Sequence, residues 1–165
     1  MVVIVMGVSG AGKTTVGQRL AAALGCGFRD ADEFHSRENI AKMAAGIPLT
    51  DEDRAPWLEA LRDIVRSALE SGEDLVLACS ALKRSYRELL TVDAGRQRWV
   101  YLWAPREVLA ERLARRRGHY MPRTLLDSQL ATLEPPEGAM AVDVSPEPDV
   151  VVATILQGLG LQRSS

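Results

Sequence analysis

Residues 7–14, GVSGAGKT, match the phosphate-binding pattern G-x-x-x-x-G-K-[ST]. The motif directly follows an apolar, mostly β-branched run at 2–6 and opens a segment with helical periodicity, which is the context that this pattern requires. Its glycines let the backbone wrap closely around phosphates, so that N–H groups and a helix N-terminus face the anion. We therefore expect Lys13 to reach the β- and γ-phosphates of a nucleotide and the hydroxyl of Thr14 to bind Mg²⁺.

Two carboxylates, Asp30 and Asp32, follow a short predicted strand around 28–29. Both should lie near the carboxyl edge of the sheet, where open α/β sheets bind ligands. One can join the Mg²⁺ shell, and the other can accept a proton from an attacking hydroxyl held in line with the γ-phosphate. The alternative is a solvated loop or an N-cap for the next short helix. Nearby His35 is equally consistent with a substrate contact and with a surface histidine.

The elements that position these residues alternate between strands and helices. Further strands are predicted at 74–80 and 98–104, with a weak fifth strand at 141–145, and the helices at 13–24, 37–45, 48–72, 105–117 and 148–159. Thr50 with Asp53 suits the start of the long helix as a capping box, whereas Pro56 marks either a later start or a kink. The alternation predicts an α/β fold with an open, mostly parallel five-stranded sheet and helices on both faces.

Composition limits the classes of function. The chain has 165 residues, 47% apolar and 25% charged, with a net charge of −2. This near balance argues against a protein that binds nucleic acid or an anionic membrane through electrostatics. Cys26 and Cys79 lie far apart in apolar settings, so we interpret them as reduced core residues of an intracellular protein. No apolar run approaches a membrane span or signal segment, and we expect a cytoplasmic, single-domain protein with no membrane or nucleic-acid partner.

The chain contains four stretches whose combination is specific: MGVSGAGKTT, DADEFHSRENIAKMAAGIPLTDEDRAPWL, LACSALKRSYRELL and RRRGHYMPRTLLDSQLATLEPP. Together they resemble the gluconate kinase (gluconokinase) family, the small P-loop type related to shikimate and adenylate kinases, over about residues 4–136. The resemblance implies a P-loop kinase fold over residues 1–165, with a small helical lid at about 115–135. It also implies the reaction ATP + D-gluconate → ADP + 6-phospho-D-gluconate.

The resemblance assigns roles on the nucleotide side of the site. Asp30 is similar to the residue that helps to place the metal, and Asp32 to the carboxylate that faces the acceptor hydroxyl in the related shikimate kinases. Thr14 is the other implied Mg²⁺ ligand, and Lys13 and Asp32 are expected to be catalytic. The family's ATP loop falls on Gly7, Val8, Ser9, Gly10, Ala11, Gly12, Lys13, Thr14 and Thr15.

On the acceptor side, the resemblance places Arg54 where such kinases direct an arginine at a substrate carboxylate. A guanidinium binds a carboxylate in a two-pronged fork, although an intrahelical ion pair is the alternative for Arg54. Ser80, Lys83 and Arg87 are spaced to line one side of a turn that runs into a helix. They supply the cationic and hydroxyl partners that a polyhydroxy acid needs, and a solvated basic turn is the alternative for Arg87.

The segment ERLARRRGHYMP corresponds to the lid of this superfamily, whose arginines stabilise charge on the transferring phosphoryl and help to exclude water. Arg116 and His119 match the family pattern R-x-G-H, so we expect Arg116 to be catalytic and His119 to bind substrate. Arg112 is the next candidate, as an ATP-binding residue. An ordinary basic helix face is the alternative for this segment.

Two rival functions remain open from the sequence. The first is a P-loop kinase for another small hydroxy acid such as shikimate, although the LACSALKRSYR stretch differs from the Gly-rich loop typical of shikimate kinases. The second is a non-enzymatic nucleotide-binding regulatory module, which has no reason to gather carboxylates and cations at an acceptor side. Relatives are often dimers, which leaves a homodimer open, since no surface stripe in the sequence demonstrates an interface.

Overall fold

The computed structural model describes residues 1–115 and 123–165. The strands are β1 (Val2–Met6), β2 (Gly27–Asp30), β3 (Leu75–Ala78), β4 (Gln97–Trp103) and β5 (Met140–Asp143). The α-helices are α1 (Lys13–Leu24), α2 (Arg37–Ala44), α3 (Asp51–Ser71), α4 (Arg84–Leu90), α5 (Arg106–Arg115), α6 (Arg123–Thr132) and α7 (Pro148–Leu159). Short 3₁₀ helices span Ala31–Phe34 and Ala94–Arg96.

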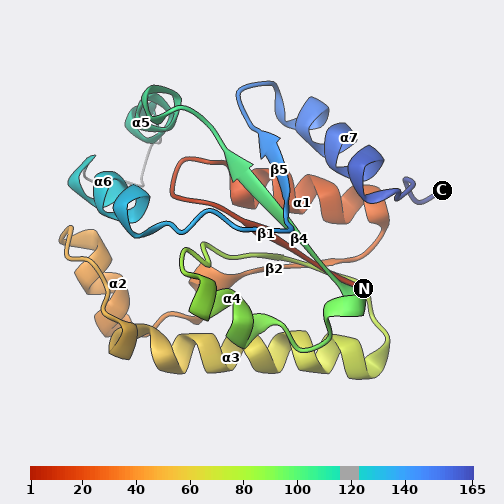
Figure 1. The fold of residues 1–165 in the computed structure, drawn as a ribbon, viewed down its shortest axis with the longest axis horizontal. Helices are drawn as coiled ribbons and strands as arrows, with labels where there is room; N and C mark the ends of the chain where they lie inside the picture. The colour runs from red at the N-terminus through yellow and green to blue at the C-terminus, as the bar shows by residue number, and fades with distance from the viewer. Residues whose placement is uncertain (116–122) are drawn as a thin grey trace.

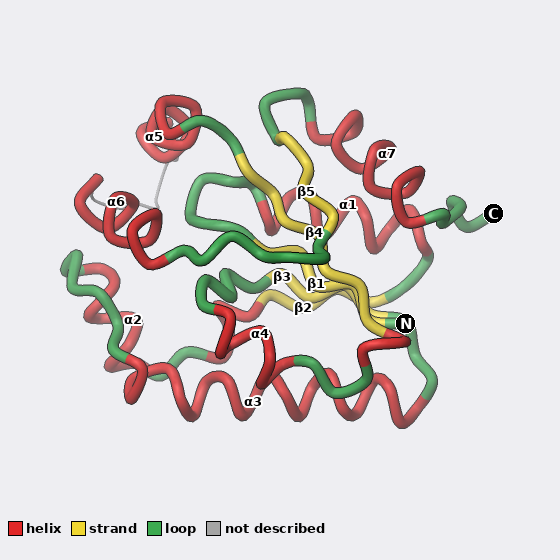
Figure 2. The backbone as a smooth tube through the Cα atoms, in the orientation of Figure 1, coloured by secondary structure: helices red, strands yellow, loops and turns green. Residues whose placement is uncertain are grey.

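The strands form one parallel sheet in the order β2-β3-β1-β4-β5. All five residues of β1 are buried, because this strand lies at the centre and both of its faces are covered. Val3 and Val5 pack into the core shared with α1, α5 and α7, whereas Ile4 and Met6 belong to the core shared with α3 and α4. Figures 1 and 2 show the strands between these two groups of helices. The predicted open sheet with helices on both faces is confirmed.

The capping box at the start of α3 forms as its sequence predicts. The Thr50 hydroxyl accepts a hydrogen bond from the Asp53 backbone N–H at 3.1 Å, and the Asp53 carboxylate accepts one from the Thr50 N–H at 2.9 Å. The Thr50 N–H, with the Lys42 ammonium at 2.9 Å, lowers the pKa of Asp53 to about 2. The helix therefore begins at Asp51 and runs through Pro56, which lies inside it.

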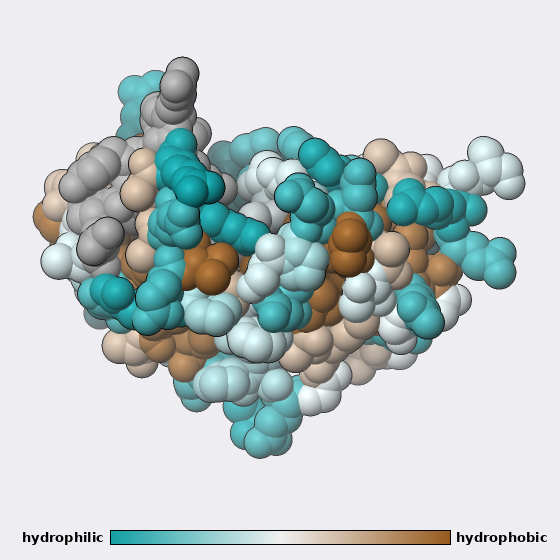
Figure 3. Space-filling view, turned by 90° about the horizontal axis from the view of Figure 1, so that it is seen from above, coloured by the Kyte–Doolittle hydropathy of each residue, from teal (hydrophilic) through white to brown (hydrophobic). Residues whose placement is uncertain are grey.

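All strands point the same way, so the segments that follow them meet at one edge of the sheet. β1 leads into the phosphate-binding motif, β2 ends at Asp30, and β3 leads through Cys79 to Ser80. Viewed over α5 and α7, the described surface shows hydrophilic side chains with hydrophobic ones between them (Figure 3). Within the two described ranges, no helix has both the length and the apolar character needed to cross a membrane.

Candidate functional site

The phosphate loop, residues 7–14, packs closely against β4 and α5. Gly10 and Gly12 adopt φ angles of 88° and 83°, a left-handed conformation that favours glycine. A Cβ atom at Gly10 would lie only 2.9 Å from the carbonyl oxygen of Leu109 in α5, so the position admits no side chain. α2 and α3 are capped by the side chains of Ser36 and Thr50, whereas the N-cap of α1 is Gly12, which provides no side-chain cap. The first N–H groups of α1 therefore face the loop, where they can bind phosphate oxygens.

Thr14, Asp30 and Asp32 are linked by hydrogen bonds at this loop, where Lys13 also lies. The Thr14 hydroxyl donates a hydrogen bond to Asp30 Oδ2 at 2.7 Å, and Asp30 Oδ1 accepts one from the Asp32 N–H at 3.0 Å. Lys13 Nζ donates to the Val8 carbonyl at 3.2 Å. Mg²⁺ prefers hard oxygen ligands and usually combines one or two protein oxygens with phosphates and water. The Thr14 and Asp30 oxygens fit that requirement.

The electrostatics around Cys79 show that the predicted charges converge at the carboxyl edge. Burial raises the pKa of the Cys79 thiol to about 12, and a backbone hydrogen bond from Ala81 opposes the shift. The carboxylates of Asp32 and Asp30 raise this pKa further, and the Lys13 ammonium lowers it. Two carboxylates and one ammonium, from two separate segments, therefore act on one buried thiol just after β3.

A pocket opens beside Asp32 and is lined by Asp32, His35, Met43, Pro48, Leu49, Arg54, Trp57, Ser80, Leu125, Ser128, Gln129 and Thr132; we call it the acceptor pocket. The ring of His35 stacks on that of Trp57, with centroids 4.2 Å apart and planes 13° from parallel. Trp57 is anchored by a hydrogen bond from its indole N–H to the Ala31 carbonyl at 2.7 Å. Burial lowers the pKa of His35, which favours the uncharged ring in this pocket.

Arg54 lines the acceptor pocket, as its predicted role requires, and its guanidinium is held from two sides. It donates to the Leu49 carbonyl at 2.8 Å and to the Tyr86 hydroxyl at 3.2 Å. Tyr86 in turn donates to the Asp51 carboxylate. Lys83 pairs with the same carboxylate at 2.9 Å, and it is not among the residues that line this pocket. The structure thus brings Arg54 and Ser80 to Asp32 but leaves Lys83 engaged with Asp51.

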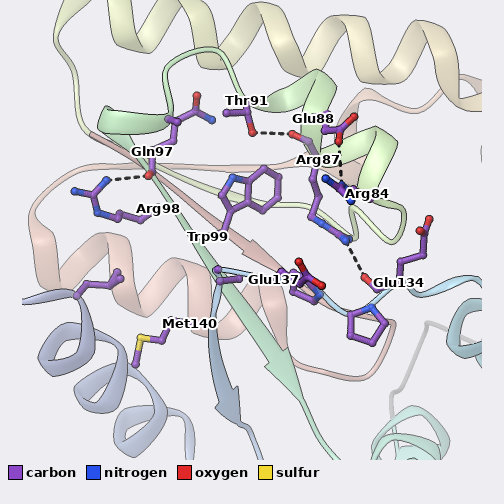
Figure 4. A pocket seen from close by; sticks show the side chains of 16 residues that line it. Arg84, Arg87, Glu88, Thr91, Gln97, Arg98, Trp99, Glu134, Glu137 and Met140 are labelled. Carbon is purple, nitrogen blue, oxygen red and sulfur yellow. Dashed lines mark hydrogen bonds and ion pairs between the residues drawn. The ribbon is translucent and has the colours of Figure 1, made fainter.

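Arg87 lies away from the acceptor pocket. Its guanidinium donates to the backbone carbonyls of Ala81 at 2.8 Å, Leu82 at 3.2 Å and Glu134 at 2.8 Å. Figure 4 shows it in a separate cavity of about 970 Å³ between α4, the start of β4 and the segment before β5. These bonds tie the turn after β3 to the chain that follows α6, which is a structural role.

Arg112 lies on a second cleft beside the phosphate loop. This cleft is lined by Gly10, Ala11, Gly12, Thr15, Val16, Arg112, Val144, Ser145, Pro146, Glu147, Pro148 and Val151. The Arg112 guanidinium donates to the Val144 carbonyl, which joins α5 to the segment after β5. The cleft continues from the loop and so provides room for the rest of a nucleotide. The predicted residues Arg116 and His119 lie outside the described residues.

The sequence prediction missed the contribution of α6 to the acceptor pocket. Leu125, Ser128, Gln129 and Thr132 line it. Their spacing is i, i+3, i+4, i+7, which is the periodicity of one face of a helix. A polar face in the segment LLDSQLAT was therefore a readable signal. The segment 144–148 on the nucleotide side was also missed, and it carries no comparable pattern.

Comparisons with known proteins show the family and the fold of the chain. A family model described as an AAA domain matches residues 2–136. A gluconokinase of Gluconobacter oxydans (strain 621H) is 48% identical over 157 residues, which cover 93% of this chain and 88% of the relative. The solved structure of a gluconokinase from Sinorhizobium meliloti 1021 is 48% identical, with a TM-score of 0.86 over 96% of this chain and 90% of its own. A shikimate kinase from Aquifex aeolicus, 22% identical with a TM-score of 0.61 over 97% of this chain and 96% of its own, shares the fold.

Proposed function

The chain belongs to the gluconokinase family, and from this premise we propose how its own residues transfer a phosphoryl group from ATP to D-gluconate. The activity is that of an ATP-dependent phosphotransferase acting on a sugar acid. The observation that carries the proposal is the position of the acceptor pocket. A carboxylate, an arginine and a hydroxyl, from Asp32, Arg54 and Ser80, line one pocket beside the phosphate loop.

In the proposed mechanism, the N–H groups of the loop and Lys13 hold the β- and γ-phosphates of ATP. Asp32 orients the 6-hydroxyl of gluconate and accepts its proton as the oxygen attacks the γ-phosphorus. A new bond forms between that oxygen and phosphorus, while the bond from phosphorus to the β–γ bridging oxygen breaks. ADP leaves with the bonding electrons, and the product is 6-phospho-D-gluconate.

We propose that Thr14 and Asp30 hold Mg²⁺, with support from the 2.7 Å contact between their side-chain oxygens. When bound, the ion would neutralise charge on the β- and γ-phosphates. The acid–base chemistry remains with Asp32. We also propose that residues 1–165 form a single kinase domain with a lid at about 115–135. We propose a cytoplasmic location and a homodimer as well. The free thiols of Cys26 and Cys79 support the location.

The acceptor is tested directly by ADP release from Mg·ATP with no acceptor, D-gluconate, shikimate, D-glucose or AMP. Release should be stimulated by gluconate alone, with a phosphorylated sugar acid as product. Stimulation by shikimate or AMP would retain the fold and the phosphate loop but replace the acceptor. Nucleotide binding without stimulation by any of these compounds would favour the regulatory module.

Replacing Arg54 with alanine should raise KM for gluconate by about tenfold or more, because a charge-assisted, two-pronged bond to the substrate carboxylate is lost. KM for ATP should stay within about twofold, since Arg54 lies on the acceptor side. Steady-state kinetics with each substrate varied in turn measures both values.

The matched control is Arg66→Ala, a change in the same helix at an exposed arginine paired with Asp63. It should leave both KM values unchanged. If Arg54→Ala gave the wild-type KM for gluconate, the carboxylate would have to bind elsewhere.

A further inference from the structure

We propose that Gln129 is a further positioning and specificity-determining residue, acting in the gap between the phosphate loop and the acceptor pocket. Before ATP binds, the side-chain carbonyl of Gln129 accepts a hydrogen bond from the Ser9 N–H. In the enzyme with ATP and acceptor bound, its NH₂ group donates a hydrogen bond to the oxygen that accepts the phosphoryl group. This inference rests on the acceptor site proposed above.

Gln129 contacts both halves of the site. Its Oε1 atom accepts a hydrogen bond from the backbone N–H of Ser9 at 2.8 Å, and the same side chain lines the acceptor pocket with Asp32 and Ser80. The orientation of the Gln129 amide follows from this contact, because the Ser9 N–H is a donor and must face the carbonyl oxygen of the amide. The opposite end is an NH₂ group, which can only donate hydrogen bonds.

The backbone around Gln129 is fixed on both sides. In the middle of α6, two residues before Gln129, Asp127 accepts two hydrogen bonds from Arg106 at the start of α5, at 2.7 and 3.0 Å. Beyond the C-terminal end of α6, the Glu134 carbonyl accepts a hydrogen bond from Arg87 at 2.8 Å, and the Glu134 N–H donates to the Leu82 carbonyl at 2.8 Å. The contact between Gln129 and the loop is therefore made from a supported helix, which suits a residue that must hold a reacting group in place.

The Ser9 N–H belongs to the loop whose N–H groups are proposed to bind the phosphate oxygens of ATP. In the structure, this N–H donates to the neutral carbonyl oxygen of Gln129. A hydrogen bond to an anionic phosphate oxygen is about twice as strong as a neutral one. ATP would therefore displace the Gln129 carbonyl from Ser9 and free the amide to act on the acceptor. A carboxylate in its place would lose the NH₂ donor and set a negative charge beside the transferring phosphoryl group.

The test compares Gln129→Met, which keeps the volume, with Gln129→Glu, which keeps the shape and the ability to accept from Ser9. We expect Gln129→Met to raise KM for gluconate about tenfold, with KM for ATP within about twofold. Gln129→Glu should lower kcat about a hundredfold, more than Gln129→Met does, because it adds charge where the phosphoryl group passes. Gln157→Glu, at an exposed position of α7, is the control for the added charge and should behave like the wild type.

If Gln129 only fastens α6 to the loop, Gln129→Met should lower the melting temperature and leave KM for gluconate at the wild-type value, because what is lost is the bond to the Ser9 N–H and not a bond to the acceptor. That wild-type KM for gluconate would overturn the proposal. Melting temperature and ATP affinity, measured for each variant, identify a loss of folding. Wild-type enzyme that is not stimulated by gluconate would instead contradict the proposed function, and the variants would then be compared with the acceptor found in the panel.

Discussion

Replacing Lys13 with alanine should lower kcat by roughly a thousandfold, because a positioned cation that stabilises charge on the transferring phosphoryl group is removed. The structure gives the ammonium a place at the loop, 3.2 Å from the Val8 carbonyl. The fold should remain intact, since Lys13 lies in the first turn of α1 and is not part of either core. Single-turnover kinetics measures the transfer step, and thermal unfolding measures the fold.

Arg19→Ala is the matched control in the same helix. This arginine is exposed and pairs with Asp149 at 3.0 Å, so its loss removes a positive charge from α1 without touching the loop. Wild-type kcat is expected for this variant. A Lys13→Ala enzyme that retained more than about a tenth of the wild-type kcat would remove Lys13 from the transfer step.

The Asp32→Asn change should lower kcat by at least about a hundredfold, because an amide cannot accept the proton of the attacking hydroxyl. KM for ATP should change by no more than about threefold, since Asp32 lines the acceptor pocket. The asparagine keeps the shape of the side chain, and the backbone N–H of Asp32 can still donate to Asp30. Steady-state kinetics with ATP and gluconate each varied separates the two effects.

Glu33→Gln provides the comparison, because this exposed neighbour lies in the same 3₁₀ helix and is not among the residues that line the pocket. It should retain wild-type kcat. Equal losses in Glu33→Gln and Asp32→Asn would point to the general charge of the segment, and an unchanged kcat in Asp32→Asn would exclude Asp32 as the base.

Most of the scaffold could be predicted from the sequence, because local patterns determine it. The buried run of β1 and the Gly12–Lys13 boundary predict the strand, the loop and the start of α1, and α1 and α7 have the predicted bounds. The position of Asp30 at the carboxyl end of the sheet followed from the same reasoning, although the structure includes it as the last residue of β2. The sequence left open whether Pro56 starts the long helix, and the structure shows that the Thr50–Asp53 capping box determines the start.

Side-chain partners across the fold were less accessible to prediction. Lys83 and Arg87 have the charge that an acid-binding site needs, but their spacing does not reveal that Asp51 and the Glu134 carbonyl lie within reach. These contacts join residues 32 and 47 positions apart. Gln129 and the Ser9 N–H are separated by 120 positions, so their contact depends on how α6 packs over the loop.

The two sides of the site are built by different parts of the chain, and this division has an evolutionary consequence. The phosphate loop is enclosed by β4 and α5, where Gly7 and Gly10 admit no side chain. The wall of the acceptor pocket comes largely from residues 43–57 and from α6. Apart from Gln129, which contacts the Ser9 N–H, substitutions in that wall would change the groups that face the pocket without contacting the N–H groups of the loop. A lineage built on this scaffold would therefore have room to vary its acceptor, while close packing against β4 and α5 keeps the backbone of its loop unchanged.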